Sequence, residues 1–263
     1  MFLRKLSEVI WQAVKPVIGT SEAYKDIREN IYGQTTKGID KIAEDACINF
    51  LQKNEVSIKL ISEESGIFTF GDEPRYTLII DPIDGSTNAS RGVPFFCLSL
   101  ALLDGTTFND VIAGIIRAPL LLKNNLFEVE KGRDIKVDGK PIYPLPMEEK
   151  LSKAIVSMYV YDCDLEKVKS VVSQAYKTRL FGSVALEICY TATGLIDALI
   201  DTRGSLKIMD IVAAKLFIEE AGGIITDMEG NPLTSNVFEL SERYSIVCAS
   251  NRSLHQEIIS LLG

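Results

Sequence analysis

The sequence predicts an α+β fold in which mixed, largely antiparallel sheets are layered with helices. Segments with strand character alternate irregularly with segments of helical period, and not in regular strand–helix–strand units. Residues 95–130 contain short apolar runs separated by turn dipeptides, such as Asp-Gly at 104–105 and Asn-Asn at 124–125, which indicates consecutive hairpins. The 263 residues, 46% apolar and 24% charged, are enough for one large globular domain or two modest ones.

Two helices separated by a loop are expected at the start of the chain. Residues 2–18 place apolar side chains at helical spacing, and Pro16 should kink the helix or end its regular hydrogen bonding. Residues 33–38 (GQTTKG) are expected to form a loop between two glycines. The second helix should begin near Asp40, because the dipole of a helix favours a negative charge in its first turn.

Two strands are predicted next, and each runs directly into a carboxylate. Residues 56–62 are followed by Glu63, and residues 76–80 are followed by Asp81.

The segment 143–149 (YPLPMEE) contains two prolines and two glutamates, and it is the best boundary between two halves, 1–146 and 147–263. In the second half we expect strands at 153–161, 195–201, 222–227 and 244–250. We also expect helices at 164–176, at 182–194 with Ser183 as N-cap and Gly194 at the C-terminal end, at 210–221, and at the C-terminus.

Charge and cysteine usage exclude several classes of function. The net charge of −8 argues against general nucleic-acid binding, which needs a basic face. No apolar run is long enough to span a bilayer, and the amphipathic N-terminus is not a secretory signal. The five cysteines are far apart and form no CxxC pair, which predicts a reducing cytoplasm and mostly buried thiols.

Four carboxylates stand at the ends of predicted elements: Glu63, Asp81, Asp84 and Asp210. Asp81 and Asp84 are three residues apart, and like charges that close repel unless a cation compensates them. Oxygen-rich sites suit hard cations such as magnesium, and a two-metal site can serve phosphoryl transfer. Each piece also has a plainer interpretation, as a turn at Asp81–Asp84, a solvated acidic turn at Glu63, or a helix cap at Asp210.

The residues after Asp84 fit a phosphate site. Gly85 allows close approach of the backbone, and Ser86 can start a short helix whose free N–H groups face a phosphate. Two other phosphate-handling classes are excluded by their motifs. No D-x-D follows an apolar strand, as a haloacid-dehalogenase-type phosphatase requires, and no GxxxxGK[ST] loop is present.

Three motifs, in the same order and spacing, resemble those of the inositol monophosphatase family. DPIDGSTN (81–88) resembles its D-P-[IL]-D-G-[ST]-x-N signature, SEES (62–65) its G-E-E-S, and MDIVAAKLFIEEAGG (209–223) its W-D-x-x-A…E-A-G-G. The resemblance covers nearly the whole chain. It implies a five-layered α-β-α-β-α sandwich, usually a homodimer, that acts as a magnesium-dependent, lithium-sensitive sugar phosphatase.

The resemblance also implies roles for particular residues. The metal ligands would be Glu63, Asp81, Ile83 through its backbone carbonyl, Asp84 and Asp210, holding two to three Mg²⁺ ions per site, with Mn²⁺ as a possible substitute. GIDKIAED (38–45) resembles the family's T-x-x-D-x-x-x-E stretch, so Asp40 and the Ser86 hydroxyl would orient an attacking water. Asp84 would also lie near the leaving group. Gly85 and Ser86 would hold the phosphate with backbone amides, and the loop 33–38 would close over the site.

Arg203 bears on the substrate. It lies seven residues before Asp210, where animal inositol monophosphatases carry a glutamate that contacts inositol. An arginine suits a second anionic group. The D-x-R pattern at 201–203 resembles the archaeal and thermophile branch that hydrolyses both fructose 1,6-bisphosphate and inositol 1-phosphate. Arg179, Tyr159 and Tyr161 are candidates for the same distal phosphate, although the tyrosines fit core or interface packing equally well. Met209 replaces the family's tryptophan.

The leading hypothesis is a phosphatase for a small phosphorylated sugar or polyol, namely fructose 1,6-bisphosphate and inositol 1-phosphate. Two different functions stay open: a nucleotide phosphatase that acts on 3′-phosphoadenosine 5′-phosphate or NADP, and a regulatory binding protein on the same fold. His255, the single histidine, is expected at the surface of the last helix.

Overall fold

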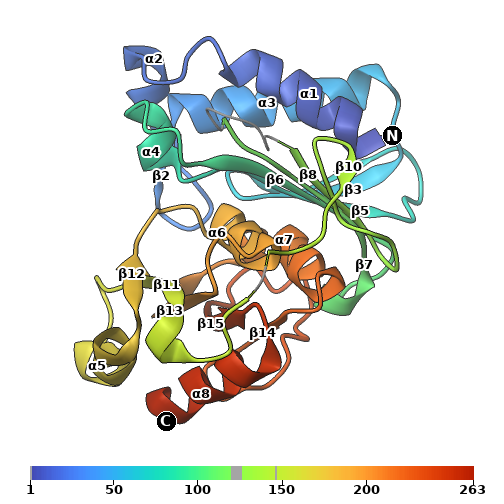
Figure 1. Cartoon of the computed structure of the whole chain (residues 1–263). Helices are drawn as coiled ribbons and strands as arrows, with labels where there is room; N and C mark the ends of the chain where they lie inside the picture. The colour runs from blue at the N-terminus through green and yellow to red at the C-terminus, as the bar shows by residue number, and fades with distance from the viewer. Residues whose placement is uncertain (1, 120–125, 146) are drawn as a thin grey trace.

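The chain folds into five stacked layers in a computed structural model that describes residues 2–119, 126–145 and 147–263 (Figure 1). The layers are, in order, helices α1 (Phe2–Val14) and α3 (Gly38–Lys53), an eight-stranded sheet, helices α6 (Val184–Thr193) and α7 (Ile208–Glu220), a five-stranded sheet, and helices α5 (Leu165–Gln174) and α8 (Arg252–Leu262). The predicted α-β-α-β-α sandwich is therefore confirmed. The Asn-Asn turn at 124–125 and residue 146, next to the predicted boundary, lie outside the described residues.

The larger sheet places the first two predicted carboxylates side by side. Its strands, in spatial order, are β10 (Lys140–Pro141), β9 (Lys136–Val137), β8 (Leu126–Glu130), β7 (Val111–Arg117), β6 (Cys97–Leu103), β5 (Thr77–Asp84), β3 (Ile58–Ser62) and β4 (Gly66–Phe70). Its neighbours pair antiparallel except β3 and β5, which are parallel with Ser62 opposite Ile80. Because parallel strands run in the same direction, Glu63, which directly follows β3, lies beside Ile80 and Asp81 of β5, and its amide donates to the Ile80 carbonyl at 3.4 Å, while β5 itself continues to Asp84.

The smaller sheet has the order β12 (Lys177–Arg179), β11 (Ile155–Tyr159), β13 (Ala198–Leu206), β15 (Tyr244–Ala249) and β14 (Ile224–Thr226). Strand β11 is parallel to both of its neighbours, and the other pairs are antiparallel. This mixture agrees with the predicted largely antiparallel sheets.

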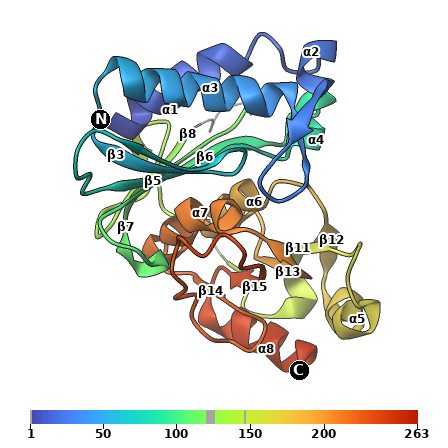
Figure 2. The same ribbon diagram turned by 180° about the vertical axis from the view of Figure 1, so that it is seen from behind.

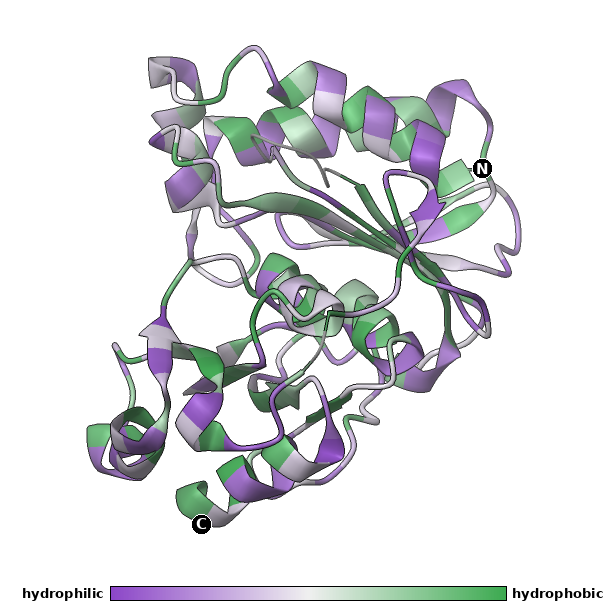
Figure 3. Cartoon of the chain, viewed as in Figure 1, coloured by the Kyte–Doolittle hydropathy of each residue, from purple (hydrophilic) through white to green (hydrophobic). Residues whose placement is uncertain are grey.

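The middle helices are apolar around nearly their whole circumference because a sheet covers each side (Figure 3). One hydrophobic core runs through them and contains residues of both sheets, such as Ile79 of β5 and Leu199 of β13. A second core lies between the larger sheet and helices α1 and α3, which lie side by side in both views (Figure 2).

The expected loop at 33–38 is wrong in part. Residues Thr35–Lys37 form strand β2, which pairs with β1 (Asp26–Glu29) in a hairpin, and α3 begins at Gly38, two residues before Asp40. Short helix α2 (Ser21–Tyr24) and strands β4 and β12 were also not predicted. Residues of β1 and β12 are exposed throughout, so burial gives them no alternating pattern.

The expectation that His255 lies at the surface is wrong. Its side chain is buried where α8 packs on the small sheet, and its Nε2 lies 2.8 Å from the Thr226 hydroxyl. The prediction of mostly buried thiols is confirmed, with only Cys163 partly exposed among the five. Among the helices of the described residues, none is both long and apolar enough to cross a membrane.

Candidate active site

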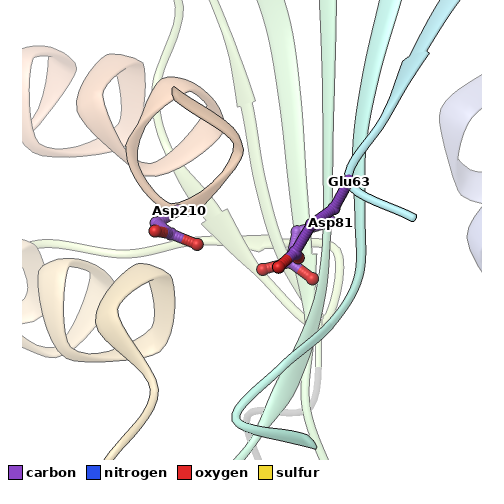
Figure 4. A group of neighbouring side chains, drawn as sticks. All are labelled: Glu63, Asp81 and Asp210. Carbon is purple, nitrogen blue, oxygen red and sulfur yellow. The ribbon is translucent and has the colours of Figure 1, made fainter. Parts of the chain in front are cut away.

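Three carboxylates from distant parts of the chain converge at the edge of the larger sheet (Figure 4). Glu63 follows β3, Asp81 lies in β5, and Asp210 lies in the first turn of α7, facing both strands across the gap between layers. One oxygen from each lies within 4.8 Å of the others. A set of carboxylate oxygens at this spacing is suited to a hard divalent cation such as magnesium.

Backbone donors fix two of these carboxylates. Asp81 Oδ1 accepts from the Ile83 amide at 3.0 Å, and Asp210 Oδ2 accepts from the Lys207 amide at 2.7 Å. Asp210 is the third residue of α7, and its side chain caps the first turn by accepting from the Lys207 amide. The interpretation of Asp210 as a helix cap is therefore correct, and the same residue also belongs to the carboxylate cluster.

The electrostatics of the cluster call for a cation. Burial and then the charges of Glu63, Asp84 and Asp210 raise the pKa of Asp81 well above its usual range. Burial and then Glu63 raise the pKa of Asp210 to about 6. Carboxylates that resist ionisation are stabilised in their charged form by a bound divalent ion, so the residues present fit a metal site.

Asp84 lies beside this cluster and is held by the N-terminus of α6. Its Oδ2 accepts from the Ser183 hydroxyl at 2.8 Å and from the Ala185 amide at 2.7 Å. Burial, followed by the charge of Asp210, raises the pKa of Asp84 to about 8 despite these donors. Ser183 occupies the predicted N-cap position of α6, yet its hydroxyl serves Asp84 and not the helix.

Asp40 reaches the same region from the first turn of α3. Its Oδ2 accepts from the Lys37 amide at 2.9 Å, and burial, Glu64 and Glu63 raise its pKa. Glu64 accepts from the buried Thr36 hydroxyl, and burial raises the pKa of this carboxyl to about 7. The predicted water-orienting residue is therefore brought close to the Glu63–Glu64 pair.

The turn after Asp84 is built as the motif suggested. Gly85 has φ +93° and precedes the short helix α4 (Ser86–Ser90), which confirms the predicted helix start. A Cβ on Gly85 would lie 2.8 Å from the carbonyl oxygen of Gly182. Asn88 donates to the carbonyls of Phe95 and Phe181 at 2.7 and 2.8 Å, so the final asparagine of the motif fastens this turn to its neighbours.

Arg203 is already enclosed by side chains. Its Nε and one terminal nitrogen donate to Asp201, with the shortest distance 2.6 Å, and the other terminal nitrogen donates to the Tyr161 hydroxyl at 2.6 Å. Its guanidinium carbon lies 4.1 Å from the Tyr159 ring centre and 4.7 Å from that of Tyr161. Arg179 lies on the exposed edge strand β12, which β11 separates from the strand of Arg203, and it donates to the Thr178 carbonyl.

Tyr159 is buried, and its hydroxyl donates to Glu187 at 3.0 Å. Of the residues predicted for the distal site, the structure thus groups Arg203, Tyr159 and Tyr161. Within the described residues no hydrogen bond or ion pair joins Arg179 to that group.

Sequence reasoning missed four residues around the site: Glu64, Lys207, Asp201 and Glu187. Glu64 is the second glutamate of the SEES motif and had a usable signal. Lys207 donates from its ammonium to Glu63 and stands in no motif that marks it. Asp201 is the aspartate of the D-x-R pattern at 201–203, but its role in fixing Arg203 was not predicted. Glu187, fully buried, accepts from the Ser157 hydroxyl at 2.5 Å as well as from Tyr159.

Comparison with known proteins identifies the family. The sequence matches the model of the inositol monophosphatase family over residues 3–263. The chain belongs to the inositol monophosphatase family. It is 33% identical over 267 residues to a fructose-1,6-bisphosphatase/inositol-1-monophosphatase of Methanothermobacter thermautotrophicus, covering 98% of this chain and 94% of that protein. Membership makes the chain a phosphoric monoester hydrolase and confirms the resemblance read from its motifs.

Two further relatives help to place this member of the inositol monophosphatase family. A bifunctional NADP phosphatase/NAD kinase of Methanocaldococcus jannaschii is 32% identical over 288 residues, covering 98% of this chain but 49% of that protein. A solved structure from Pyrococcus horikoshii, described as similar to inositol-1 monophosphatase, superposes with a TM-score of 0.84 at 28% identity and covers 100% of this chain and 97% of that one.

Proposed function

We propose that this phosphatase hydrolyses fructose 1,6-bisphosphate and inositol 1-phosphate in a magnesium-dependent reaction. The observation that carries the proposal is the convergence of Glu63, Asp81 and Asp210 beside the phosphate-binding type of turn at Gly85. The relatives named for both substrates, which match nearly the whole chain, support the choice of substrate.

The ligand set we propose consists of the carboxylates of Glu63, Asp81, Asp84 and Asp210 and the carbonyl of Ile83, for two to three Mg²⁺ ions, with Mn²⁺ as a substitute. When bound, the cations activate a water nucleophile and neutralise charge on the phosphoryl group. Asp40 and the Ser86 hydroxyl orient the water. The amides of Gly85 and Ser86 hold the phosphate, and Asp84 lies on the leaving-group side.

We place a second phosphate of the substrate at Arg203. Asp201 and the two tyrosine rings hold the guanidinium in one orientation, which lowers the entropy lost when an anion binds. Tyr161 is half exposed, and its hydroxyl lies beside the guanidinium. Tyr159 is buried, and its ring packs against the guanidinium. Arg179 belongs to this proposal only as an exposed cation on the edge strand β12 of the same sheet.

A second candidate substrate is NADP, through its 2′-phosphate. Bifunctional NADP phosphatase/NAD kinases of two methanogens match 98% of this chain, which favours NADP over 3′-phosphoadenosine 5′-phosphate and over a purely regulatory role. We further propose a cytoplasmic homodimer without nucleic-acid or membrane partners, supported by the family resemblance and by the buried, widely spaced cysteines.

The test is phosphate release from fructose 1,6-bisphosphate, inositol 1-phosphate and NADP, measured side by side with Mg²⁺ and with EDTA. We expect Mg²⁺-dependent turnover of the first two substrates and none in EDTA. Turnover of NADP alone would replace the proposed substrates, and a protein that binds Mg²⁺ but releases no phosphate would favour a regulatory role.

Arg203 is tested by Arg203→Gln combined with Asp201→Asn. Simple charge reversal would set a glutamate against Asp201, whose side chain is fully buried, and would destabilise the fold instead of probing the substrate. We expect the double variant to raise KM for the bisphosphate roughly tenfold or more, since a charge-assisted contact is worth about 1.5–3 kcal/mol, and to leave KM for inositol 1-phosphate nearly unchanged. Asp201→Asn alone is the control. Equal changes for both substrates would remove Arg203 from the distal site.

A further inference from the structure

Lys207 contacts two of the three carboxylates that form the cluster. Its backbone amide donates to Asp210 Oδ2 at 2.7 Å, and its ammonium donates to Glu63 Oε1 at 2.5 Å. Because Glu63 and Asp210 come from different layers of the sandwich, this single residue links the sheet edge to the start of α7. The proposed hydrolysis itself assigns no role to this lysine.

The ammonium of Lys207 lies in a confined place. The residue is 5% exposed, and its ammonium also donates to the Gln34 side chain and lies 4.7 Å from the ring centre of Tyr32. Gln34 and Tyr32 lie between strands β1 and β2, so the hairpin covers the ammonium from the solvent side. A buried lysine of this kind stays charged only where anions compensate its loss of hydration.

The surrounding carboxylates provide that compensation. The ammonium of Lys207 donates to Glu63, and one oxygen of Glu63 lies within 4.8 Å of an oxygen of Asp81 and of Asp210, so three carboxylates lie close to the buried positive charge. The ammonium of Lys207 therefore supplies part of the positive charge that a bound divalent cation would supply to the cluster.

We propose that Lys207 is a tethered counter-cation that holds the Glu63–Asp81–Asp210 cluster together and competes with the divalent cation for Glu63. The proposal rests on the metal site of the proposed function and adds a determinant of its affinity. The Glu63 carboxylate belongs to the candidate metal cluster and accepts from the ammonium through Oε1, so the metal and the ammonium share the single negative charge of this group. Binding of the metal then requires the ammonium to withdraw from Glu63 or to share it.

This competition predicts two effects of opposite sign. Removing the ammonium leaves the carboxylates uncompensated, so the protein in EDTA should become less stable. The same change frees Glu63 and raises the negative potential at the site, so the affinity for Mg²⁺ should increase. A lysine that merely supports the fold would change stability and leave the affinity for Mg²⁺ unaltered.

The chain offers a matched control. Lys215 lies on α7, the helix that Lys207 directly precedes as N-cap, is 3% exposed, and its ammonium pairs with Glu219 at 2.7 Å. Lys215→Met therefore removes an equally buried ammonium from α7 without touching the cluster. Lys207→Arg keeps a positive charge at the site and serves as the conservative variant.

The experiment measures the Kd for Mg²⁺ by calorimetric titration of EDTA-stripped protein, together with the melting temperature in EDTA and in saturating Mg²⁺. For Lys207→Met we expect a lower melting temperature in EDTA and a Kd for Mg²⁺ roughly fivefold tighter or more, which is the low end of coupling between two sites. Lys215→Met should lower the melting temperature and leave the Kd unchanged, and Lys207→Arg should keep a Kd near that of the unaltered protein.

An unchanged or weaker Kd for Lys207→Met would overturn the proposal. If this variant does not fold in EDTA, Lys207→Gln, which keeps a polar group beside Gln34, is measured against the same criterion. The proposed function is tested separately, by Mg²⁺-dependent phosphate release from the unaltered protein. That result does not depend on the Kd values of the variants. Failure of the unaltered protein to bind Mg²⁺ would remove both proposals.

Discussion

His255 makes the stability of the folded chain depend on pH. Burial against Thr226, and then the charge of Arg252, lower the pKa of this imidazole below its ordinary value. The unfolded chain therefore takes up a proton more readily than the folded one. The stabilising contribution of the neutral imidazole is complete above the unfolded pKa, near 6.5, and is lost as the pH falls from there through the folded pKa.

We therefore expect the contribution of His255 to the free energy of unfolding, taken as the difference between the unaltered protein and His255→Gln, to fall as the pH drops below about 6.5, by about 1.4 kcal/mol for each pH unit between the unfolded and folded pKa. Urea denaturation of the unaltered protein and of His255→Gln, which keeps a polar partner for Thr226, measures the difference. Titrating carboxylates are common to both proteins and cancel. Parallel pH profiles for the two proteins would show that His255 does not titrate in this range.

At the residue scale the motifs predicted which side chains would meet, but not what holds them. Glu63, Asp81 and Asp210 could be named because each ends or starts an element and stands in a motif. The donors from Lys207 and Ser183 could not, because they depend on which helix end packs against which strand. The burial of His255 could not be predicted for the same reason, since it depends on how α8 packs on the smaller sheet.

At the scale of elements, the turn from β5 into α4 decides the position of the phosphate-binding backbone. Gly85 has a left-handed conformation, and the Gly182 carbonyl lies where a Cβ would be. We expect Gly85→Ala to destabilise the protein by about 2 kcal/mol or more, since the left-handed conformation alone costs a non-glycine residue about 1–2 kcal/mol. Displacement of Asp84 and Ser86 should also lower kcat/KM at least about tenfold.

Gly132→Ala is the control for that prediction. Gly132 has φ +72°, but its Cβ would meet no atom within 4 Å, so this change isolates the backbone cost. Chemical denaturation and kinetics with fructose 1,6-bisphosphate measure both variants. If the two alanines behave alike in stability and activity, close packing at Gly85 is not important for the site.

The elements that the sequence revealed are those with a buried face. Strand β5 is buried at every position and was predicted, although it continues to Asp84 and not only to the expected end at residue 80. The start of α7 was predicted to within two residues. The hairpin β1–β2 and the edge strand β12 were missed because their side chains are mostly exposed and give no burial pattern.

For the whole molecule, local patterns gave only the mixture of helices and sheets. The five-layered order was available through the family resemblance, because layering depends on contacts between residues far apart in sequence. An example is the packing of Phe127 in β8 against Phe217 in α7, with ring centres 5.8 Å apart. The division into halves 1–146 and 147–263 stays a prediction.

The shared middle layer predicts that these two halves do not unfold separately. Helices α6 and α7 belong to the second half, yet one core joins them to both sheets, so separation would expose that core on two sides. We expect a single calorimetric transition in EDTA whose van't Hoff and calorimetric enthalpies agree. Phe217→Ala should lower its midpoint through a loss of about 3–5 kcal/mol without splitting it, because the cavity lies in the layer that both sheets share. Two resolved transitions, with only one shifted by Phe217→Ala, would instead make the halves independent domains and the middle layer part of the second alone.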